Sequence, residues 1–398
     1  MINNWKRLIP QKLVNSFWHL PKAILANLFY GFPSKKLTVI GVTGTSGKTT
    51  TAHLIYHLLL KAKFKVALIS TISAKIGEKE IDIGLHVTNP DPFTLQKLLK
   101  RIATKGFQFV VLEITSHGLD QHRPWGINFT YGVLTNITHE HLDYHKNFKN
   151  YQQAKLKLIK NSQIAVLNQA DPSYKSAKKI APGRIISYEA SQALLLPASL
   201  PGDFNQENVT AAQVVAQDLC ISDLDLKSAL KSFPGIPGRM EIIQTKPFTI
   251  IIDFAHKPDA LKKALISINK LKGKKGRLIS VFGSAGLRDH AKRSIMGKIA
   301  AKHSDVTILT AEDPRTENVT DINDQIEAGF IKVKSHGKLV RQPDRQKAIN
   351  LAIKMAKPDD YVCLFGKSHE KSMCFGTIEY PWDEFRAVNK ALKQRRIK

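Results

Sequence analysis

Short apolar runs alternate with segments of helical periodicity along most of the chain. We predict buried strands at residues 37–43, 65–70, 109–114, 132–136 and 165–168. The segments between them, such as residues 95–105 and 151–160, carry apolar side chains at the spacing of one helix face. This alternation is typical of a parallel sheet with helices on both faces, so the pattern predicts an α/β fold.

The alternation restarts after a cluster of turn residues at positions 233–238. Four more apolar runs then predict a second set of strands, at residues 248–253, 277–282, 306–310 and 361–365. We therefore predict two main domains, a central one at residues 37–237 and a C-terminal, Rossmann-like α/β domain at residues 238–398.

Residues 1–36 have a different pattern, which predicts one or two short amphipathic helices broken at Pro21. Their apolar positions are Leu13, Phe17, Leu20, Ile24, Leu25 and Leu28. Packing of these helices on the following domain is the favoured interpretation. The lysines and aromatic residues leave attachment to a membrane surface as an alternative.

Composition narrows the class of protein. The net charge of the 398 residues is +27, but the basic residues are spread along the chain without a nucleic-acid-binding module, so we expect no nucleic-acid partner. No apolar run is long enough to span a bilayer and no signal peptide is evident, so we expect no stable membrane insertion. Three scattered cysteines fit a reducing compartment. We expect a monomeric, cytoplasmic protein.

A glycine-rich loop follows the first predicted strand and leads into a helix. Its residues are Gly44, Thr45, Ser46, Gly47, Lys48, Thr49 and Thr50. Glycines let backbone N–H groups turn toward phosphate oxygens, and the helix N-terminus adds partial positive charge. A lysine and a threonine at these positions suit the β and γ phosphates and Mg²⁺. The sequence therefore predicts a P-loop in the central domain.

Two later strands end in residues that suit a metal site. One ends at Glu113, where a carboxylate beside a phosphate loop is a natural Mg²⁺ ligand. Five histidines lie within 29 residues at the ends of these two strands, at positions 117, 122, 139, 141 and 145. Together they indicate a site rather than core packing.

Nine segments of the chain, taken in order, resemble the Mur ligases. They are the phosphate loop and residues 113–123, 135–145, 154–155, 202–208, 238–241, 253–259, 312–315 and 366–370. The similarity extends from about residue 37 to the C-terminus. It is strongest to the branch that adds the third residue to UDP-N-acetylmuramoyl-dipeptide.

The resemblance implies an ATP-dependent ligase that forms an amide through an acyl phosphate. It implies catalytic roles for Lys48, Glu113, His141 and Lys155, and Mg²⁺ ligation by Thr49, Glu113, His141 and a carbamylated Lys155. In the family, asparagines matching Asn205 and Asn208 approach adenine, Arg239 reaches the phosphates and Asp253 the ribose, and His256 joins this nucleotide set.

The resemblance also implies the substrates, which are a muramoyl-dipeptide donor, an amino acid and ATP. The implied substrate-binding residues are Thr88, Asn89, Ser116, His117, Gln121, Arg123, Arg288, Asp313, Pro314, Arg315, Gly366 and Glu370. Residues 312–315 stand where the branch recognises its amino acid. We therefore expect a diamino acid with a distal carboxylate, such as meso-diaminopimelate, although Asp313 replaces the usual asparagine.

Some features differ from the family and leave alternatives open. Only 36 residues precede the first strand, too few for the usual UDP-binding domain, so we expect weaker recognition of UDP. Asn89 stands where the branch usually has threonine. The alternatives are a folylpolyglutamate-synthase-like ligase or another Mur-type ligase acting on a donor without UDP, and a non-catalytic nucleotide-binding module. A lipid-linked amidating ligase would need a four-cysteine zinc insert, which three cysteines do not supply.

Overall fold

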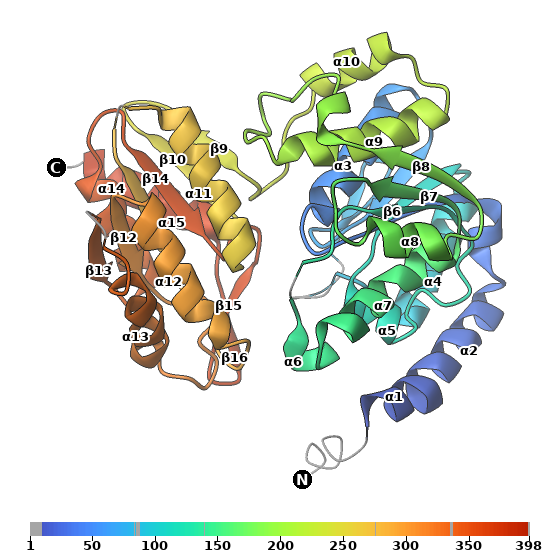
Figure 1. Ribbon diagram of the computed structural model, residues 1–398, viewed down its shortest axis with the longest axis horizontal. Helices are drawn as coiled ribbons and strands as arrows, with labels where there is room; N and C mark the ends of the chain where they lie inside the picture. The colour runs from blue at the N-terminus through green and yellow to red at the C-terminus, as the bar shows by residue number, and fades with distance from the viewer. Residues whose placement is uncertain are drawn as a thin grey trace. The chain divides into compact units, whose positions relative to one another are not determined.

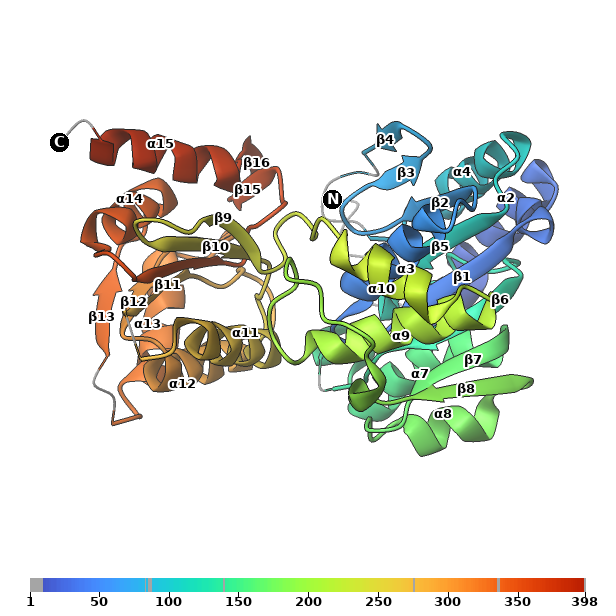
Figure 2. The same ribbon diagram turned by 90° about the horizontal axis from the view of Figure 1, so that it is seen from above.

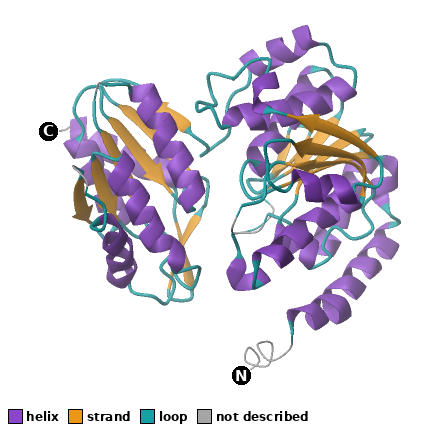
Figure 3. Ribbon diagram, in the orientation of Figure 1, coloured by secondary structure: helices purple, strands orange, loops and turns teal. Residues whose placement is uncertain are grey.

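The computed structural model describes residues 10–82, 84, 88–138, 140–274, 276–334 and 337–396. The chain divides into two compact units, and each is a sheet covered by helices (Figures 1 and 3), which confirms the predicted α/β class. Unit 1 comprises Met1–Leu196 and Asn205–Phe233, and unit 2 comprises Pro197–Phe204 and Pro234–Lys398.

Unit 1 is built on an eight-stranded sheet with the order β4-β3-β2-β5-β1-β6-β7-β8. Its strands are β1 (Thr38–Thr43), β2 (Val66–Ile69), β3 (Ala74–Ile76), β4 (Lys79–Ile81), β5 (Phe109–Glu113), β6 (Phe129–Leu134), β7 (Ser162–Asn168) and β8 (Arg184–Tyr188). The pairs β2–β3 and β3–β4 are antiparallel, and the other pairs of this sheet are parallel. Because β5, β1 and β6 are parallel neighbours, their carboxyl ends meet at one edge of the sheet.

Helices cover both faces of this sheet (Figure 2). One layer contains α3 (Lys48–Lys61), α9 (Asn205–Asp218) and α10 (Asp223–Lys231), and the other contains α4 (Pro92–Thr104), α7 (Phe148–Lys160) and α8 (Tyr174–Ile180). Two short helices, α5 (Ser116–Asp120) and α6 (Leu142–His145), follow β5 and β6. Alternate residues of β5, Val110 and Leu112, pack with Leu95 and Leu99 of α4, as the period of a buried strand requires.

The N-terminal segment is helical and packs on unit 1. It consists of α1 (Gln11–Val14), the π-helical turn η2 (Asn15–His19) and α2 (Leu20–Tyr30). The predicted break at Pro21 is wrong, because Pro21 stands in the first turn of α2, where its missing N–H is tolerated, and a π-helical turn precedes it. The Asn27 amide donates to the Trp125 carbonyl at 2.7 Å. Gly31, with φ of 70°, ends the helix.

Unit 2 is built on a six-stranded sheet with the order β13-β12-β11-β14-β10-β9, parallel except for β9. Its strands are β9 (Glu241–Gln244), β10 (Thr249–Asp253), β11 (Leu278–Phe282), β12 (Val306–Leu309), β13 (Lys338–Arg341) and β14 (Tyr361–Phe365). A separate hairpin pairs β15 (Ser372–Phe375) with β16 (Ile378–Pro381).

Two apolar cores lie on opposite faces of the second sheet. One packs against α11 (Pro258–Lys272), α12 (Ala291–His303) and α13 (Val319–Phe330), and the other against α14 (Arg345–Met355) and α15 (Glu384–Arg396) (Figure 2). Strand β14 contributes Cys363 and Phe365 to the first core and Val362 and Leu364 to the second. This alternation lets helices pack on both faces of the sheet.

Candidate active site

The phosphate loop leaves the carboxyl end of β1 and leads into α3. Gly44 has φ of 154° and Gly47 has φ of 82°. A Cβ on Gly44 would lie 1.8 Å from Thr135 Oγ1, and one on Gly47 would lie 2.1 Å from Asn208 Oδ1. These two positions therefore require glycine, because the loop passes close to neighbouring side chains.

Residues after β6 hold the loop in place. The Ser46 N–H donates to Asn136 Oδ1 at 2.9 Å, and the Thr135 hydroxyl donates to the Ser46 carbonyl at 2.7 Å. The Thr45 N–H donates to the Asn136 carbonyl at 2.8 Å. These bonds fix the loop directly ahead of a helix N-terminus. The N–H groups of the first helical turn have no intrahelical partners and suit a phosphate.

Two lysine side chains contact the same backbone carbonyl of this loop. Lys48 Nζ donates to Gly44 O at 2.9 Å, and Lys155 Nζ, from α7, donates to it at 2.6 Å. Lys155 is only 1% exposed. Two ammonium groups on one carbonyl repel each other, and burial strengthens that repulsion. A negative charge on Lys155 would replace the repulsion by attraction, so this surrounding fits a carbamylated lysine.

Thr49 and Glu113 form the part of the site that suits Mg²⁺. The Thr49 hydroxyl lies 3.0 and 3.1 Å from the two carboxylate oxygens of Glu113, and the Thr71 N–H donates to Glu113 Oε2 at 2.9 Å. Both side chains are buried. Oxygen ligands next to a phosphate loop are those that Mg²⁺ prefers, so these two residues fit that ion.

Three of the predicted histidines, His117, His141 and His145, lie together near Tyr151. The His117 ring lies 4.7 Å from that of His141 and 5.5 Å from that of His145, between centroids, and the Tyr151 ring lies 5.4 Å from that of His145. His141 has φ of 52° and lies 3.2 Å from Glu140. Among the described residues, no three His, Cys, Asp or Glu side chains are placed to hold a metal ion together. His139, a member of the predicted histidine cluster, lies outside the described residues.

Tyr151 also connects this cluster to the loop. Its hydroxyl lies 2.8 Å from Thr45 Oγ1, and Lys155 Nζ lies 4.8 Å from the centre of its ring. Burial raises the pKa of Tyr151, and the negative charge of Glu140 raises it further, so the phenol keeps its proton. Sequence reasoning did not identify Tyr151, because a lone tyrosine in a helix carries no motif.

Asn89 is buried and joins the predicted substrate loop to the end of β5. Its amide donates to the Glu113 carbonyl at 2.7 Å, and its Oδ1 accepts from the Thr115 N–H at 2.8 Å. Arg123 donates to the Asn89 carbonyl and, at 3.1 Å, to Gln121 Oε1. Asn89 therefore positions the segment that carries Glu113.

The other predicted residues of unit 1 lie near these groups. Thr88 Oγ1 is 3.0 Å from Thr71 Oγ1, and the buried Ser116 hydroxyl has no hydrogen-bond partner among the residues that the structure describes. On α9, the Asn208 amide donates to Asn205 Oδ1 at 3.0 Å. His86 and Val87, at the start of the predicted substrate loop, lie outside the described residues.

The remaining residues predicted to bind the nucleotide, Arg239, Asp253 and His256, lie in unit 2. Asp253 is the last residue of β10. Burial raises the pKa of Asp253, although Arg239 and backbone N–H donors oppose the shift. Its oxygens accept from the Met240 N–H at 2.7 Å and the Ala255 N–H at 2.9 Å. The Arg239 guanidinium lies 4.4 Å from the centre of the Phe254 ring, and His256 Nδ1 lies 2.9 Å from the Phe254 carbonyl oxygen.

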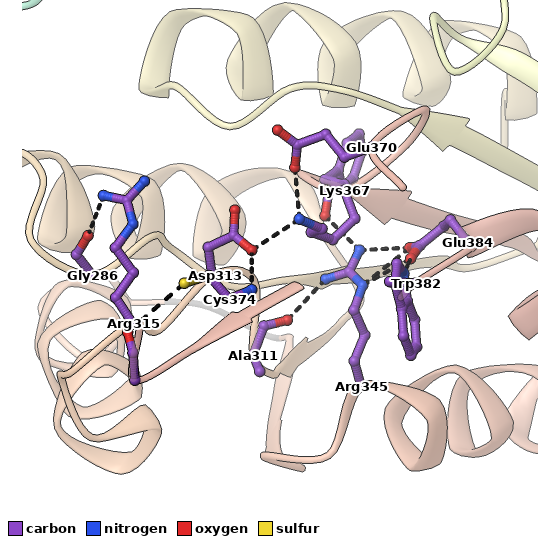
Figure 4. Close-up of polar contacts among 12 residues, drawn as sticks. Gly286, Ala311, Asp313, Arg315, Arg345, Lys367, Glu370, Cys374, Trp382 and Glu384 are labelled. Atoms are coloured by element: carbon purple, nitrogen blue, oxygen red, sulfur yellow. Dashed lines mark hydrogen bonds and ion pairs between the residues drawn. The ribbon is translucent and has the colours of Figure 1, made fainter. Parts of the chain in front are cut away.

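The predicted amino-acid site surrounds a buried lysine (Figure 4). Lys367 Nζ donates to Asp313 Oδ1 at 2.9 Å and to Glu370 Oε2 at 2.7 Å. The Cys374 N–H donates to the same Asp313 oxygen at 2.9 Å. Lys367, which sequence reasoning did not single out, thus joins two predicted substrate residues, and its position next to Gly366 was the available signal.

The Arg315 side chain points away from this cluster, as Figure 4 shows. Its guanidinium donates to the Gly286 carbonyl at 3.1 Å. Its backbone has φ of 53° and is bonded on both sides to the β15 hairpin, through the Cys374 carbonyl at 3.0 Å and the Gly376 N–H at 2.7 Å. Pro314 precedes it, and Arg288 is exposed in the loop before α12.

Glu312 is a second residue that sequence reasoning left out of the site. Its side chain is buried. Burial raises the pKa of Glu312, and the positive charge of Lys292 opposes this shift. Its Oε2 has no hydrogen-bond partner among the described residues and lies 2.8 Å from where a Cβ on Gly366 would stand. Glycine at 366 therefore leaves room for this carboxyl group.

Arg345 holds the strand ends that carry these residues (Figure 4). It donates to the Ala311 carbonyl at 3.1 Å, to the Phe365 carbonyl at 2.9 Å and, from Nε, to Glu384 Oε2 at 2.9 Å. Arg345 is 2% exposed and Glu384 is fully buried. One ion pair between the first residues of α14 and α15 thus anchors the ends of β12 and β14.

We expect Arg345→Met to lower the free energy of unfolding by about 3–5 kcal/mol, because Glu384 would remain as a buried charge without its cation. Urea denaturation followed by tryptophan fluorescence measures this. The exposed pair Lys263–Asp259 is the control, and Lys263→Met should cost less than about 1 kcal/mol. A loss for Arg345→Met as small as that of the control would contradict this role.

Comparisons with known proteins agree with this geometry. The Mur ligase middle domain matches residues 42–195, and the Mur ligase, glutamate ligase domain matches residues 238–368. A UDP-N-acetylmuramoyl-L-alanyl-D-glutamate--2,6-diaminopimelate ligase of Aquifex aeolicus is 39% identical over 392 residues, which cover 92% of this chain and 80% of that protein.

The chain belongs to the Mur ligase family. This confirms the prediction from the nine ordered segments, and the protein is an ATP-dependent amino-acid ligase. A Mur ligase of the same name from Clostridium acetobutylicum is 36% identical over 400 residues, covering 94% of this chain and 81% of that protein.

Solved structures agree with the Mur ligase fold. A structure of a diaminopimelate ligase with the same name matches with a TM-score of 0.61 at 28% identity, over 90% of this chain and 79% of that one. A bifunctional folylpolyglutamate synthase/dihydrofolate synthase from Yersinia pestis has a TM-score of 0.68 over 95% of this chain and 93% of its own. At 17% identity, that similarity shows the fold alone.

Proposed function

We propose that this Mur ligase activates the carboxylate of a muramoyl-dipeptide with ATP and joins it to a diamino acid such as meso-diaminopimelate. The observation that carries the proposal is the convergence of Lys48, Lys155 and the Thr49–Glu113 pair on one phosphate loop. The names of the relatives from Aquifex aeolicus and Clostridium acetobutylicum supply the substrates.

The chemistry follows from the charges that meet at the loop. The donor carboxylate attacks the γ-phosphorus of ATP, the bond to the β-γ bridging oxygen breaks, and an acyl phosphate and ADP result. The attacking amine then displaces phosphate from the acyl carbon and loses a proton, which leaves an amide. Because anions approach each other in the first step, Lys48 contributes mainly by neutralising charge. Mg²⁺ bound by Thr49 and Glu113 would supply further charge neutralisation.

We further propose that Lys155 is carbamylated and that His141 belongs to the metal site. The Lys155 ammonium first loses a proton, and the resulting amine adds CO₂ and releases a second proton, so that a cation becomes an anion. The buried position of Lys155 beside Lys48 supports this, since the two ammonium groups would repel each other on Gly44 O. Asn205, Asn208, Arg239, Asp253 and His256 are proposed as the nucleotide contacts.

No helix of the described residues is long and apolar enough to cross a membrane. We propose that the enzyme works as a monomer in the cytoplasm, where ATP is available. The three cysteines are free, which agrees with a reducing compartment.

Substitution of Arg315 tests which amino acid is the amine substrate. A guanidinium grips a carboxylate through two parallel N–H···O bonds, and a hydrogen bond to a charged group is worth about 1.5–3 kcal/mol. We therefore expect wild type to prefer meso-diaminopimelate over L-lysine in competition. Arg315→Ala should lower kcat/KM for meso-diaminopimelate by about tenfold to a hundredfold and leave that for L-lysine nearly unchanged.

Arg386→Ala is the control, because that side chain is 89% exposed and lies on α15. It should change neither rate. A wild-type preference for L-lysine, or a preference that survives Arg315→Ala, would refute this substrate while leaving the ligase activity in place.

A further inference from the structure

The N-terminal helical segment, Gln11–Tyr30, is oriented opposite to an ordinary surface helix: its apolar face points to solvent. Six large apolar side chains on it face solvent, and three of them are more than two-thirds exposed: Phe17 at 78%, Trp18 at 70% and Phe29 at 74%. The other three exposed apolar residues are Leu13, Leu25 and Leu28. A helix that only packs on a domain turns such side chains inward.

Small and polar residues make the contact with unit 1 instead. Ala23, Ala26 and Asn27 are fully buried, and Asn15 is 4% exposed. The Asn15 amide donates to Asp120 Oδ2 at 2.7 Å, and that of Asn27 donates to the Trp125 carbonyl. The helix is therefore held by its Ala and Asn side, which leaves its apolar side as an exposed patch of the kind that marks an interaction site.

Basic residues outnumber acidic ones around this patch. Residues 1–36 contain five lysines and one arginine, and no aspartate or glutamate. Helix α4, which packs against α2, carries Lys97, Lys100 and Arg101 and no acidic residue. Asp91, the N-cap of α4, lies 3.4 Å from Lys22. An apolar face with Trp and Phe, bordered by basic residues, is the pattern of helices that lie in the interface of anionic membranes.

We propose that Gln11–Tyr30 binds the surface of an anionic phospholipid membrane. Phe17, Trp18, Leu25, Leu28 and Phe29 enter the boundary between headgroups and acyl chains, and the lysines meet the lipid phosphates. The helix lies on the membrane and does not span it. Unit 1 is thereby held at the membrane surface, because the opposite side of the same helix is bonded to it.

The experiment is sedimentation of the full-length protein with phosphatidylglycerol/phosphatidylcholine vesicles and with pure phosphatidylcholine vesicles. We expect binding to the anionic vesicles that weakens as NaCl is raised, and much weaker binding to the neutral ones. Phe17→Ser/Trp18→Ser should reduce the affinity at least about tenfold, since burial of one such side chain is worth about one to two powers of ten. Trp18 emission should shift to the blue on binding, and Trp18→Phe should lose most of that shift.

Leu224→Ser and Ile331→Ser are matched controls, because these side chains are 79% and 71% exposed on other parts of the surface. Neither should change vesicle binding, and all variants should keep the ligation rate with a water-soluble donor. Failure of wild type to bind anionic vesicles, or equal binding after Phe17→Ser/Trp18→Ser, would overturn the proposal. So would a protein dimer that this double variant dissociates in the absence of vesicle binding, since the patch would then bind a second copy.

Discussion

Lys48→Ala is expected to lower the rate of ATP-dependent ligation by at least about 10²–10³-fold, the usual cost of removing one preorganised group that stabilises transition-state charge. Lys48 stands at the first position of α3 and contacts the carbonyls of Gly44 and Thr45, at 2.9 and 3.1 Å. Its ammonium is therefore held over the loop where the γ-phosphate is proposed to react.

Phosphate release with saturating donor and amino acid measures this effect. Lys61→Ala is the matched control, since Lys61 is an exposed lysine in the last turn of the same helix and should leave the rate unchanged. Thermal melting of both variants shows whether the fold is retained. Near wild-type phosphate release by a folded Lys48→Ala protein would remove this loop from the mechanism.

Lys155→Ala should lose about 10²-fold or more of the ligation rate, because it removes the proposed carbamate from the metal site. Short carboxylic acids such as acetate should restore part of the activity, since they supply a carboxylate to the space that the side chain vacates. Added bicarbonate should stimulate wild type only. Rescue distinguishes a lost carbamate from a damaged fold, as a misfolded variant would not respond to acetate.

Wild type incubated with ¹³C-bicarbonate should in addition show a carbamate carbon by NMR, and Lys155→Ala should not. Lys160→Ala, an exposed lysine on the same helix α7, is the control and should behave like wild type in both measurements. Equal activity of wild type and Lys155→Ala would exclude carbamylation from the mechanism.

The apolar pattern predicted the central strands of both sheets. Strands β1, β5 and β14 are almost continuous apolar runs because each is buried on both faces, and such runs are visible in a sequence. The edge strands β4, β8, β9 and β13 and the short strand β3 were missed. Strand β13 has two charged, exposed ends, and β4 contains Lys79 and Glu80, so neither shows an apolar run.

The candidate site was predictable where a residue belongs to a motif with a chemical reason. Lys48, Thr49 and Glu113 are of this kind, and the structure brings them together. Glu312 lies in the predicted segment 312–315 but was not named as a site residue, and Arg345 was missed altogether. The importance of both arises from packing: the carboxyl group of Glu312 is buried next to Gly366, and Arg345 joins strand ends that are distant in the sequence. No local pattern reports such long-range contacts.

The central claim is that ATP cleavage is coupled to amide formation at the loop that carries Lys48. The most direct measurement is ADP formation by the purified protein with the muramoyl-dipeptide and meso-diaminopimelate each omitted in turn, together with product analysis by mass spectrometry. The account predicts steady ADP formation only when both substrates are present, with one amide formed for each ADP. ADP formation that ignores the donor and the amino acid, or steady turnover without amide product, would contradict it.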